Sequence, residues 1–293
     1  MGQGKLVTCL TATLLLVRCS HQKNIVVGSK NFTEQTILGE IAAQHLERRL
    51  GQPVKRKLGL GGTLLAHQAL SSGEIDLYPE YTGTAFTNVM KHEPISDPAA
   101  VLDRLRSDYR AMKLQWLDPL GFNNSFAMVI RGDDARNRRL GSLSDAASDK
   151  NGFRLGAGYE FLSRPDGFGL LNASYGLKWN GRPTSMDLGL LYTALNDKQV
   201  DMVAGAATDG VLSVLDVTIL ADDKKVFPPY QACLVVRSEA LADHPNLRAI
   251  LSELSGRIST EAMQRMNYDV DGKHRQPADV AREFLNRLDG PQP

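Results

Sequence analysis

The sequence has few cysteines and almost no excess of either charge. Of its 293 residues only 3 are cysteine, and 34 Lys and Arg against 33 Asp and Glu leave a formal net charge of +1. A nearly neutral chain lacks the basic surface that holds a phosphate backbone, so nucleic-acid binding is excluded. The hydrophobic fraction of 42% is enough for sizeable cores, and the length suits about two domains.

Motifs of the common enzyme classes are also missing. There is no Gly-x-Ser-x-Gly elbow, no Walker A sequence, and no dinucleotide spacing among the glycines at 59–62. Glu80 and Asp209 each follow a predicted strand, but the sequence does not place them near one another as an acid–base pair. We therefore predict a protein that is not an enzyme and has no cofactor. An enzyme built on the same architecture is the rival of a different class.

Histidines are few, and their spacing does not suit a metal site. None forms a His-x-x-x-His or Cys-His grouping, and most stand in polar contexts where we expect them to be exposed. The six are His21, His45, His67, His92, His244 and His274. We predict no metal.

Long hydrophobic runs are absent except at the N-terminus. There, Lys5 precedes an apolar run over 6–17, which is too short to span a bilayer and resembles a secretory signal peptide over residues 1–19. The sequence before Cys19 resembles a bacterial lipoprotein signal, in which the cysteine is acylated, but Arg18 departs from that pattern. Lipidation of Cys19, plain cleavage and an uncleaved anchor stay open. After removal of Cys9 and modification of Cys19, only Cys233 would remain, within an apolar run typical of a buried structural thiol.

What the sequence does contain is a repeated strand, glycine turn and helix unit. The run over 25–27 is β-branched, as in a strand buried on both faces, and Gly28 ends it. Asn31 is then expected to cap a helix, with Glu34 closing a capping box. Such a helix start directs free backbone N–H groups at the ends of parallel strands, where α/β sheets bind small polar ligands.

Further units of this kind indicate two interlocked α/β lobes. Lobe 1 comprises residues 24–124 and 230–293, and lobe 2 comprises residues 125–229. The basic stretch at 132–139 is interpreted as a solvated surface connection, and a helix is expected from about Val211. The paired prolines at 228–229 fix an extended path that suits a crossing between lobes.

Aromatic residues make up only 6% of the chain, yet several stand at the tips of predicted strands in both lobes. These are Tyr81, Phe126, Tyr159, Phe161 and Tyr230. Closure of the lobes would bring the rings around one small ligand. Ring faces attract a cation whose charge is spread over methyl groups, by about 0.5–2 kcal/mol per face.

Four segments, in order, resemble the substrate-binding proteins of osmoprotectant ABC importers, which take glycine betaine, carnitine and choline. The segments are residues 28–35, 78–84, 222–230 and 263–268, and the likeness covers about residues 24–288. It implies a type II periplasmic-binding-protein fold, with two α/β lobes, a hinge and a ligand cleft between the lobes. It further implies an aromatic cage for the quaternary ammonium and hydrogen-bond donors for the ligand's carboxylate.

The resemblance also implies roles for individual residues. Tyr81, Tyr159 and Tyr230 match cage positions, and Phe126 and Phe161 join them. Candidates for the polar end of the ligand are Thr33, Gln35, Thr63, Thr82 and Asn124. Thr208 and Asp209 match a second-lobe tip that commonly reads Thr-Thr-Asp, although Ala207 replaces its first threonine. Arg164 lies within reach of the lobe 2 rim, with a surface salt bridge as the alternative.

Together these observations predict an exported receptor, periplasmic or held outside the cytoplasm by a lipid anchor. It is expected to be a monomer that binds a small zwitterionic or cationic methylated amine and delivers it to a permease and ATPase pair. An ergothioneine receptor of the same family is the second reading of the ligand. A ligand-sensing domain fused to a permease or signalling module is a further rival, for which the sequence shows no extra domain.

Overall fold

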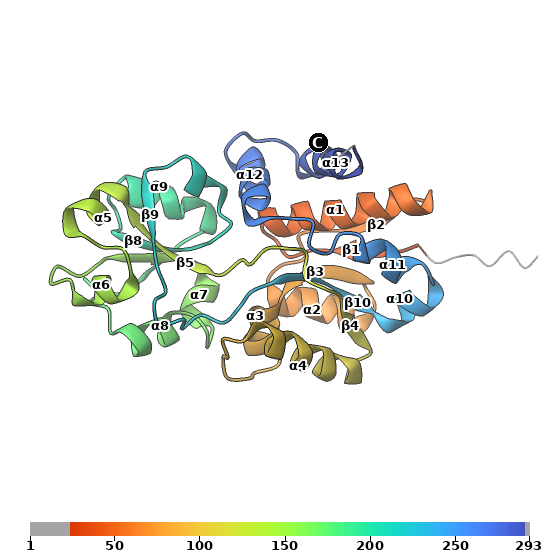
Figure 1. Cartoon of the computed structure of the whole chain (residues 1–293), viewed down its shortest axis with the longest axis horizontal. Helices are drawn as coiled ribbons and strands as arrows, with labels where there is room; N and C mark the ends of the chain where they lie inside the picture. Colours follow the sequence, from red (N-terminus) through yellow and green to blue (C-terminus); the bar gives the residue numbers. More distant parts are fainter. Residues whose placement is uncertain (1–23, 291–293) are drawn as a thin grey trace, which may run out of the picture.

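The computed structural model of the protein describes residues 24–290, and the side chain of Ser213 is not described. The predicted signal peptide and Cys19 lie outside these residues. Within them the chain forms two α/β lobes that lie side by side, each built around a five-stranded sheet (Figure 1). No helix of residues 24–290 combines the length and the apolar character needed to span a membrane.

The sheet of lobe 1 has the strand order β2-β1-β3-β10-β4. Its first three strands are parallel, and β10 runs antiparallel to both of its neighbours. The strands are β1 (Val26–Gly28), β2 (Lys55–Lys57), β3 (Leu77–Tyr81), β4 (Leu114–Trp116) and β10 (Ala232–Arg237). Cys233 on β10 is fully buried, which confirms the expected buried thiol.

Helices cover both faces of this sheet (Figure 1). Because strand side chains alternate, Leu77 and Tyr81 of β3 join the core under α1, whereas Tyr78 joins the core under α2 and α4. The lobe 1 helices are α1 (Thr33–Leu50), α2 (Thr63–Ser72), α3 (Thr82–Thr84), the π-helix η1 (Ala85–Val89), α4 (Pro98–Ala111), α10 (Ser238–Asp243), α11 (Leu247–Ser252), α12 (Thr260–Asp271) and α13 (Pro277–Asp289).

The sheet of lobe 2 has the order β7-β6-β8-β5-β9, with β5 antiparallel to β8 and β9. Its strands are β5 (Phe126–Arg131), β6 (Leu155–Ala157), β7 (Thr184–Ser185), β8 (Met202–Ala206) and β9 (Val217–Leu220). Its helices are α5 (Gly132–Arg138), α6 (Leu143–Ser148), α7 (Tyr159–Ser163), α8 (Phe168–Tyr175), the 3₁₀ turn η2 (Leu188–Leu190), α9 (Leu191–Asn196) and the 3₁₀ turn η3 (Gly210–Ser213).

Two segments cross between the lobes, residues 117–125 and residues 221–231 (Figure 1). They lie side by side, because the N–H of Asn124 donates to the carbonyl of Tyr230 at 3.0 Å. Helix α12 of lobe 1 also touches lobe 2, where Gln264 Nε2 donates to the carbonyl of Ala207 at 2.8 Å. The structure therefore shows the lobes in contact.

Three local predictions are wrong. Asn31 does not cap α1, which begins at Thr33 after an extended Phe32 that makes no side-chain cap. The Asn31 N–H instead donates to the carbonyl of Gly61 at 3.1 Å, and the Glu34 side chain is bound in the interior. Residues 132–138 form the helix α5, whose first turn carries two aspartates that complement the helix dipole. The helix expected from Val211 is only the 3₁₀ turn η3.

Candidate functional site

Tyr81 stands at the end of β3, beside the first turn of α1. Its hydroxyl donates to Glu34 Oε1 at 2.6 Å, and Asn124 Nδ2 from the first crossing segment donates to the same oxygen at 2.7 Å. Asn267 from α12 donates to Glu34 Oε2 at 3.0 Å. The Phe32 ring stacks on the Tyr81 ring with centroids 6.3 Å apart. We call Phe32, Glu34, Tyr81, Asn124 and Asn267 the Tyr81 group.

The carboxyl of Glu34 is buried, and no basic side chain of residues 24–290 forms an ion pair with it. Burial raises the pKa of Glu34 above its usual value, although hydrogen bonds from the side chains of Thr208, Tyr81 and Asn267 oppose the shift. A cation placed beside this carboxyl would favour its ionised form. The Tyr81 group therefore contains an acceptor for positive charge.

Lys30 lies next to this group and is itself buried. Its Nζ lies 2.5 Å from Glu80 Oε1, donates to Thr63 Oγ1 at 3.1 Å, and stands 5.1 Å from the centroid of the Tyr81 ring. Gln35 Oε1 accepts from the Lys30 N–H at 3.3 Å, while Gln35 Nε2 is buried without a hydrogen-bond partner in the described part of the chain. Glu80 is thus part of an ion pair, not of a carboxylate pair with Asp209.

A second cluster lies around Tyr230, where the second crossing segment meets lobe 2. The Phe126 ring lies 4.8 Å from Phe161, 5.6 Å from Phe227 and 5.4 Å from Tyr230, each edge to face. Such edge-to-face pairs add to the stability given by burial. These four rings, together with Arg164, Asp166 and Thr87, are called the Tyr230 group below.

A cation is already present in the Tyr230 group. The Arg164 guanidinium lies 5.2 Å from the Phe126 ring centroid and 5.8 Å from that of Tyr230. It donates to both carboxylate oxygens of Asp166, at 2.8 and 2.6 Å. The exposed fractions are only 8% for Arg164 and 0% for Asp166, so the alternative of a surface salt bridge is wrong.

Asp166 also binds groups outside lobe 2. Thr87 Oγ1 of lobe 1 donates to its Oδ2 at 2.7 Å, and the Tyr230 hydroxyl donates to the same oxygen at 2.8 Å. Burial raises the pKa of Asp166, but the hydrogen bonds and charge of Arg164 outweigh it, and the net pKa is below the usual value. An ionised, fully bonded carboxylate thus joins both lobes and a crossing segment.

The tip after β8 lies against lobe 1. Asp209 Oδ2 accepts from the Tyr192 hydroxyl at 2.7 Å and from the Ala206 N–H at 2.8 Å. Burial raises the pKa of Asp209 to about 6, and the nearby charges of Glu34 and Asp271 act in the same direction. Asn267 Nδ2 donates to the carbonyl of Thr208 at 2.8 Å, which connects this tip to the Tyr81 group.

Besides the residues beside Lys30 (Gln35 and Thr63) and those on the tip after β8 (Thr208 and Asp209), three more predicted site residues lie outside both groups. Tyr159 begins α7 with 75% of its surface exposed. Thr33 Oγ1 donates to Asp271 Oδ1 at 2.6 Å in an exposed position. Thr82 Oγ1 donates to the carbonyl of Pro229 at 2.9 Å and accepts from the Gln231 N–H at 3.0 Å, so it fixes the second crossing segment.

The histidines are less exposed than expected. His45 is fully buried, its Nε2 lies 3.0 Å from the carbonyl of Ile250, and burial lowers its pKa. His244 is also buried, so the expectation of exposure is wrong for these two residues. Among residues 24–290 there is no group of three or more His, Cys, Asp and Glu side chains arranged to hold a metal ion.

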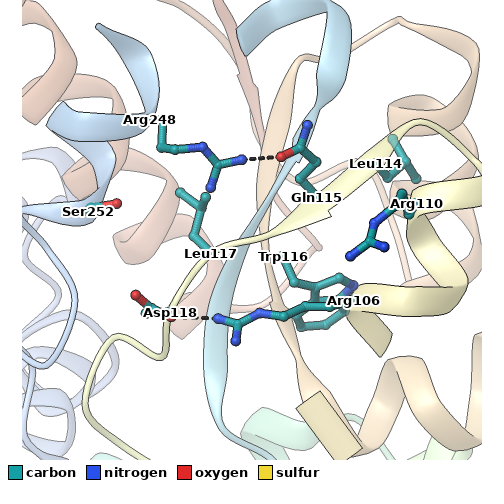
Figure 2. Close-up of a pocket in the computed structure, with 9 residues that line it drawn as sticks. All are labelled: Arg106, Arg110, Leu114, Gln115, Trp116, Leu117, Asp118, Arg248 and Ser252. Atoms are coloured by element: carbon teal, nitrogen blue, oxygen red, sulfur yellow. Dashed lines mark hydrogen bonds and ion pairs between the residues drawn. The ribbon is translucent and has the colours of Figure 1, made fainter. Parts of the chain in front are cut away.

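A pocket of about 440 Å³ lies elsewhere, on lobe 1 between α4, β4 and α11 (Figure 2). None of the predicted site residues lines it. It is therefore separate from the Tyr81 and Tyr230 groups.

Two lobes joined by two crossing segments, with polar and aromatic groups buried between them, define the class of two-lobed binding proteins. The chain belongs to the family described as the substrate-binding domain of ABC-type glycine betaine transport systems (OpuAC), which matches residues 23–287. The predicted family, the two-lobed fold and the role as substrate-binding protein of an ABC importer are thus confirmed. Members of this family are extracytoplasmic transporter components that work with a permease and an ATPase, and they are not a class of enzymes.

Individual relatives agree with this assignment. The chain is 34% identical over 291 residues to the carnitine transport binding protein OpuCC of Listeria monocytogenes, covering 96% of this chain and 94% of that protein. It is 36% identical to the ergothioneine transport permease/ergothioneine binding protein EgtU of Helicobacter pylori strain G27, covering 92% of this chain and 48% of that protein. A solved glycine betaine/carnitine/choline ABC transporter structure superposes with a TM-score of 0.78 at 32% identity, covering 90% of this chain and 98% of that one.

Sequence reasoning missed several of the residues that meet between the lobes. Glu34 was expected only as a helix cap, Lys30 and Asn267 had no expected role, and Asp166 was not expected to bind Arg164. Glu34, Lys30 and Asn267 lie in segments that carry the family resemblance, which is a sequence signal for them, whereas Asp166 lies in none of these segments.

Proposed function

We propose that the protein binds a small quaternary ammonium compound, of the glycine betaine, carnitine or choline type, between its lobes and delivers it to the permease of an ABC importer. The observation that carries this proposal is that two clusters of rings lie where the crossing segments meet the lobes, one around Tyr81 with the buried carboxyl of Glu34 and one around Tyr230. Asn124 links them, since its N–H donates to the carbonyl of Tyr230 and its Nδ2 donates to Glu34. Aromatic faces and an unpaired carboxyl both favour a cation.

The methylated ammonium group fits this environment better than a primary amine. A primary ammonium carries three N–H donors that each need an acceptor in a buried site. The acceptors nearest the rings are occupied, since Glu34 accepts from Tyr81, Asn124 and Asn267. A trimethylammonium group needs no acceptor and contacts rings through its methyl groups.

A ligand carboxylate would be bound by the buried cations and donors close to the rings. Lys30 stands over Tyr81 and Arg164 over Tyr230, and Gln35 Nε2 is a buried donor without a partner among residues 24–290. Thr63 already binds Lys30 and would help to orient it. In this proposal Tyr81, Tyr230, Phe126 and Phe161 serve the cation, and Gln35, Thr63 and Asn124 serve the polar end. Tyr159 is exposed, and it would join the rings that contact the cation only if α7 shifts on binding.

Binding is proposed to work through closure of two bodies, residues 24–124 with 230–293 and residues 125–229. Thr87, Asn267 and Gln264 of lobe 1 each bond to lobe 2. A ligand that contacts both lobes adds to these bonds only in the closed form, and so shifts the equilibrium toward closure.

Ergothioneine is the second candidate ligand, because the chain is 36% identical to the EgtU protein over 270 residues. Its trimethylammonium group suits the same rings, whereas its thione ring needs further contacts.

We also propose that the protein acts as a monomer without catalytic activity, and that Cys19 is the acylated first residue of the mature chain. Mass spectrometry of the membrane fraction tests the last point, since an unmodified mature N-terminus would refute it.

Calorimetry of the protein against glycine betaine, choline, carnitine and ergothioneine tests the main proposal. We expect a heat of binding with at least one of the methylated amines, and the compound with the highest affinity identifies the ligand. Binding of an ordinary amino acid, with no heat from any methylated amine, would contradict the proposal.

A further inference from the structure

The pocket on lobe 1 is lined by three arginines that come from two helices. Arg106 and Arg110 stand four residues apart on α4, so they lie on the same face of the helix. Arg248 reaches the pocket from α11, on the other side of β4 (Figure 2). Guanidinium groups thus enter one pocket of about 440 Å³ from two sides.

The charge in this pocket is not balanced. Asp118 is the one carboxylate among the nine lining residues, and its Oδ1 lies 2.5 Å from Arg106 Nη2. Arg248 donates to the amide oxygen of Gln115, which carries no charge. The Arg110 side chain has no hydrogen-bond or ion-pair partner within residues 24–290. Since the whole chain has a formal net charge of only +1, this excess of positive charge is local.

A buried donor lies beside the arginines. Trp116 on β4 is only 3% exposed, and its indole N–H has no hydrogen-bond partner among the described residues. A buried donor without an acceptor is costly, by about 1–3 kcal/mol, unless something else supplies one. β4 is also the outermost strand of its sheet in the described chain, so one edge of its backbone faces away from β10.

From this geometry we propose that the pocket binds a small anion with two or more negative charges, such as a polycarboxylate or a phosphate. Arginine forks match the oxygens of carboxylates and phosphates in a bidentate way. The volume lies within the usual range for small-molecule sites, about 300–1,000 Å³. This site is separate from the one between the lobes and does not depend on what that site binds.

The test is calorimetry of the purified protein with citrate and with inorganic phosphate, at an ionic strength held constant with NaCl. Binding of at least one of the two is expected, and the comparison between them decides between carboxylate and phosphate chemistry. Arg110→Gln and Arg248→Gln are each expected to weaken binding about tenfold, since each removes a charge-assisted contact. Asp118→Asn should tighten binding, because it removes the only carboxylate of the lining.

Arg104→Gln is the matched control. Arg104 lies on the same helix and has the same charge, but it is exposed and pairs with Asp108 outside the pocket. Its substitution should leave anion affinity within about twofold of the wild type, since exposed pairs contribute little. Absence of binding with both anions, or equal losses in Arg104→Gln and Arg110→Gln, would overturn the proposal.

Discussion

The Tyr81 group and the Tyr230 group lie at the same junction between the lobes, but only the buried carboxyl of the Tyr230 group is paired with a cation. In the Tyr230 group a buried cation and a buried anion are paired, with Arg164 bonded to Asp166 through two hydrogen bonds. In the Tyr81 group the carboxyl of Glu34 receives neutral donors only. Consequently, the pKa of Asp166 lies below its usual value and the pKa of Glu34 lies above it.

The difference separates a structural role for the Tyr230 group from the binding role that we propose for the Tyr81 group. A buried pair whose members satisfy one another holds the lobes and the crossing segment together, as Asp166 does with Thr87 and Tyr230. A buried carboxyl without a cation is unfavourable until a cation arrives. We infer that the Tyr81 group gains most from a cationic ligand, while the Tyr230 group supplies rings and rigidity.

The largest effect is expected on the free energy of unfolding when the paired carboxylate of the Tyr230 group is removed. Asp166→Asn leaves the buried Arg164 with only the half-exposed Glu160, 3.7 Å away, as a counter-charge, and it should lower the free energy of unfolding by about 3–5 kcal/mol. The counterpart in the other group, Glu34→Gln, should cost far less, because Glu34 has no cation to leave behind. Urea unfolding of both variants measures the difference.

Asp216→Asn is the control for this prediction. Asp216 also binds an arginine, Arg136, through two oxygens, but both side chains are about two-thirds exposed. Its loss should destabilise the protein far less than the loss of Asp166, since exposed ion pairs contribute little. If Asp166→Asn is no more destabilising than Asp216→Asn, the buried pair does not have the structural role assigned to it.

The stability of the protein should depend on pH through Asp209, which stands on the tip after β8 that lies against the Tyr81 group. The pKa of Asp209 rises from 3.8 to about 6 on folding, so its ionisation opposes folding. This penalty is absent below the unfolded pKa of 3.8, grows as the pH rises from there to about 6, and is constant at higher pH. Relative to Asp209→Asn, the wild type should gain about 2 kcal/mol of stability as the pH falls from about 7.5 to about 4.5. A difference between the two proteins that does not change with pH would show that Asp209 is not buried as described.

Substitutions of Tyr81 and Tyr230 should have smaller effects, and they should distinguish the contribution of each ring to ligand affinity from that of its hydroxyl. Tyr81→Ala and Tyr230→Ala remove a ring and should weaken binding of a quaternary amine by about 1–3 kcal/mol without unfolding the protein. Tyr81→Phe and Tyr230→Phe keep the ring and should lose less affinity than the alanine variants. Calorimetry with glycine betaine, alongside circular dichroism as a check on folding, distinguishes the four. Wild-type affinity in both alanine variants would refute the assignment of these rings.

Local patterns in the sequence predicted most of the fold and part of the site. The strand, turn and helix units could be predicted because strands begin and end in recognisable ways, and Tyr81, Phe126, Phe161 and Tyr230 stand near such strand tips. The pairing of charges could not be predicted. Thr87 and Asp166 are 79 residues apart, and Asn267 and Glu34 are 233 apart, so only the tertiary structure brings them together. Glu34 matches a helix-cap pattern, but side-chain donors from distant segments hold it in the interior instead.

The most direct test compares glycine betaine with 3,3-dimethylbutanoate, in which a carbon replaces the nitrogen. The two molecules share shape and carboxylate, and differ only in the positive charge of the methylated centre. Glycine betaine is predicted to bind at least tenfold more tightly than this carbon isostere, whose methylated centre is neutral, since two ring faces contribute on the order of 1–4 kcal/mol. Equal affinities in calorimetry would contradict this prediction, because the rings and Glu34 would then recognise shape and not charge.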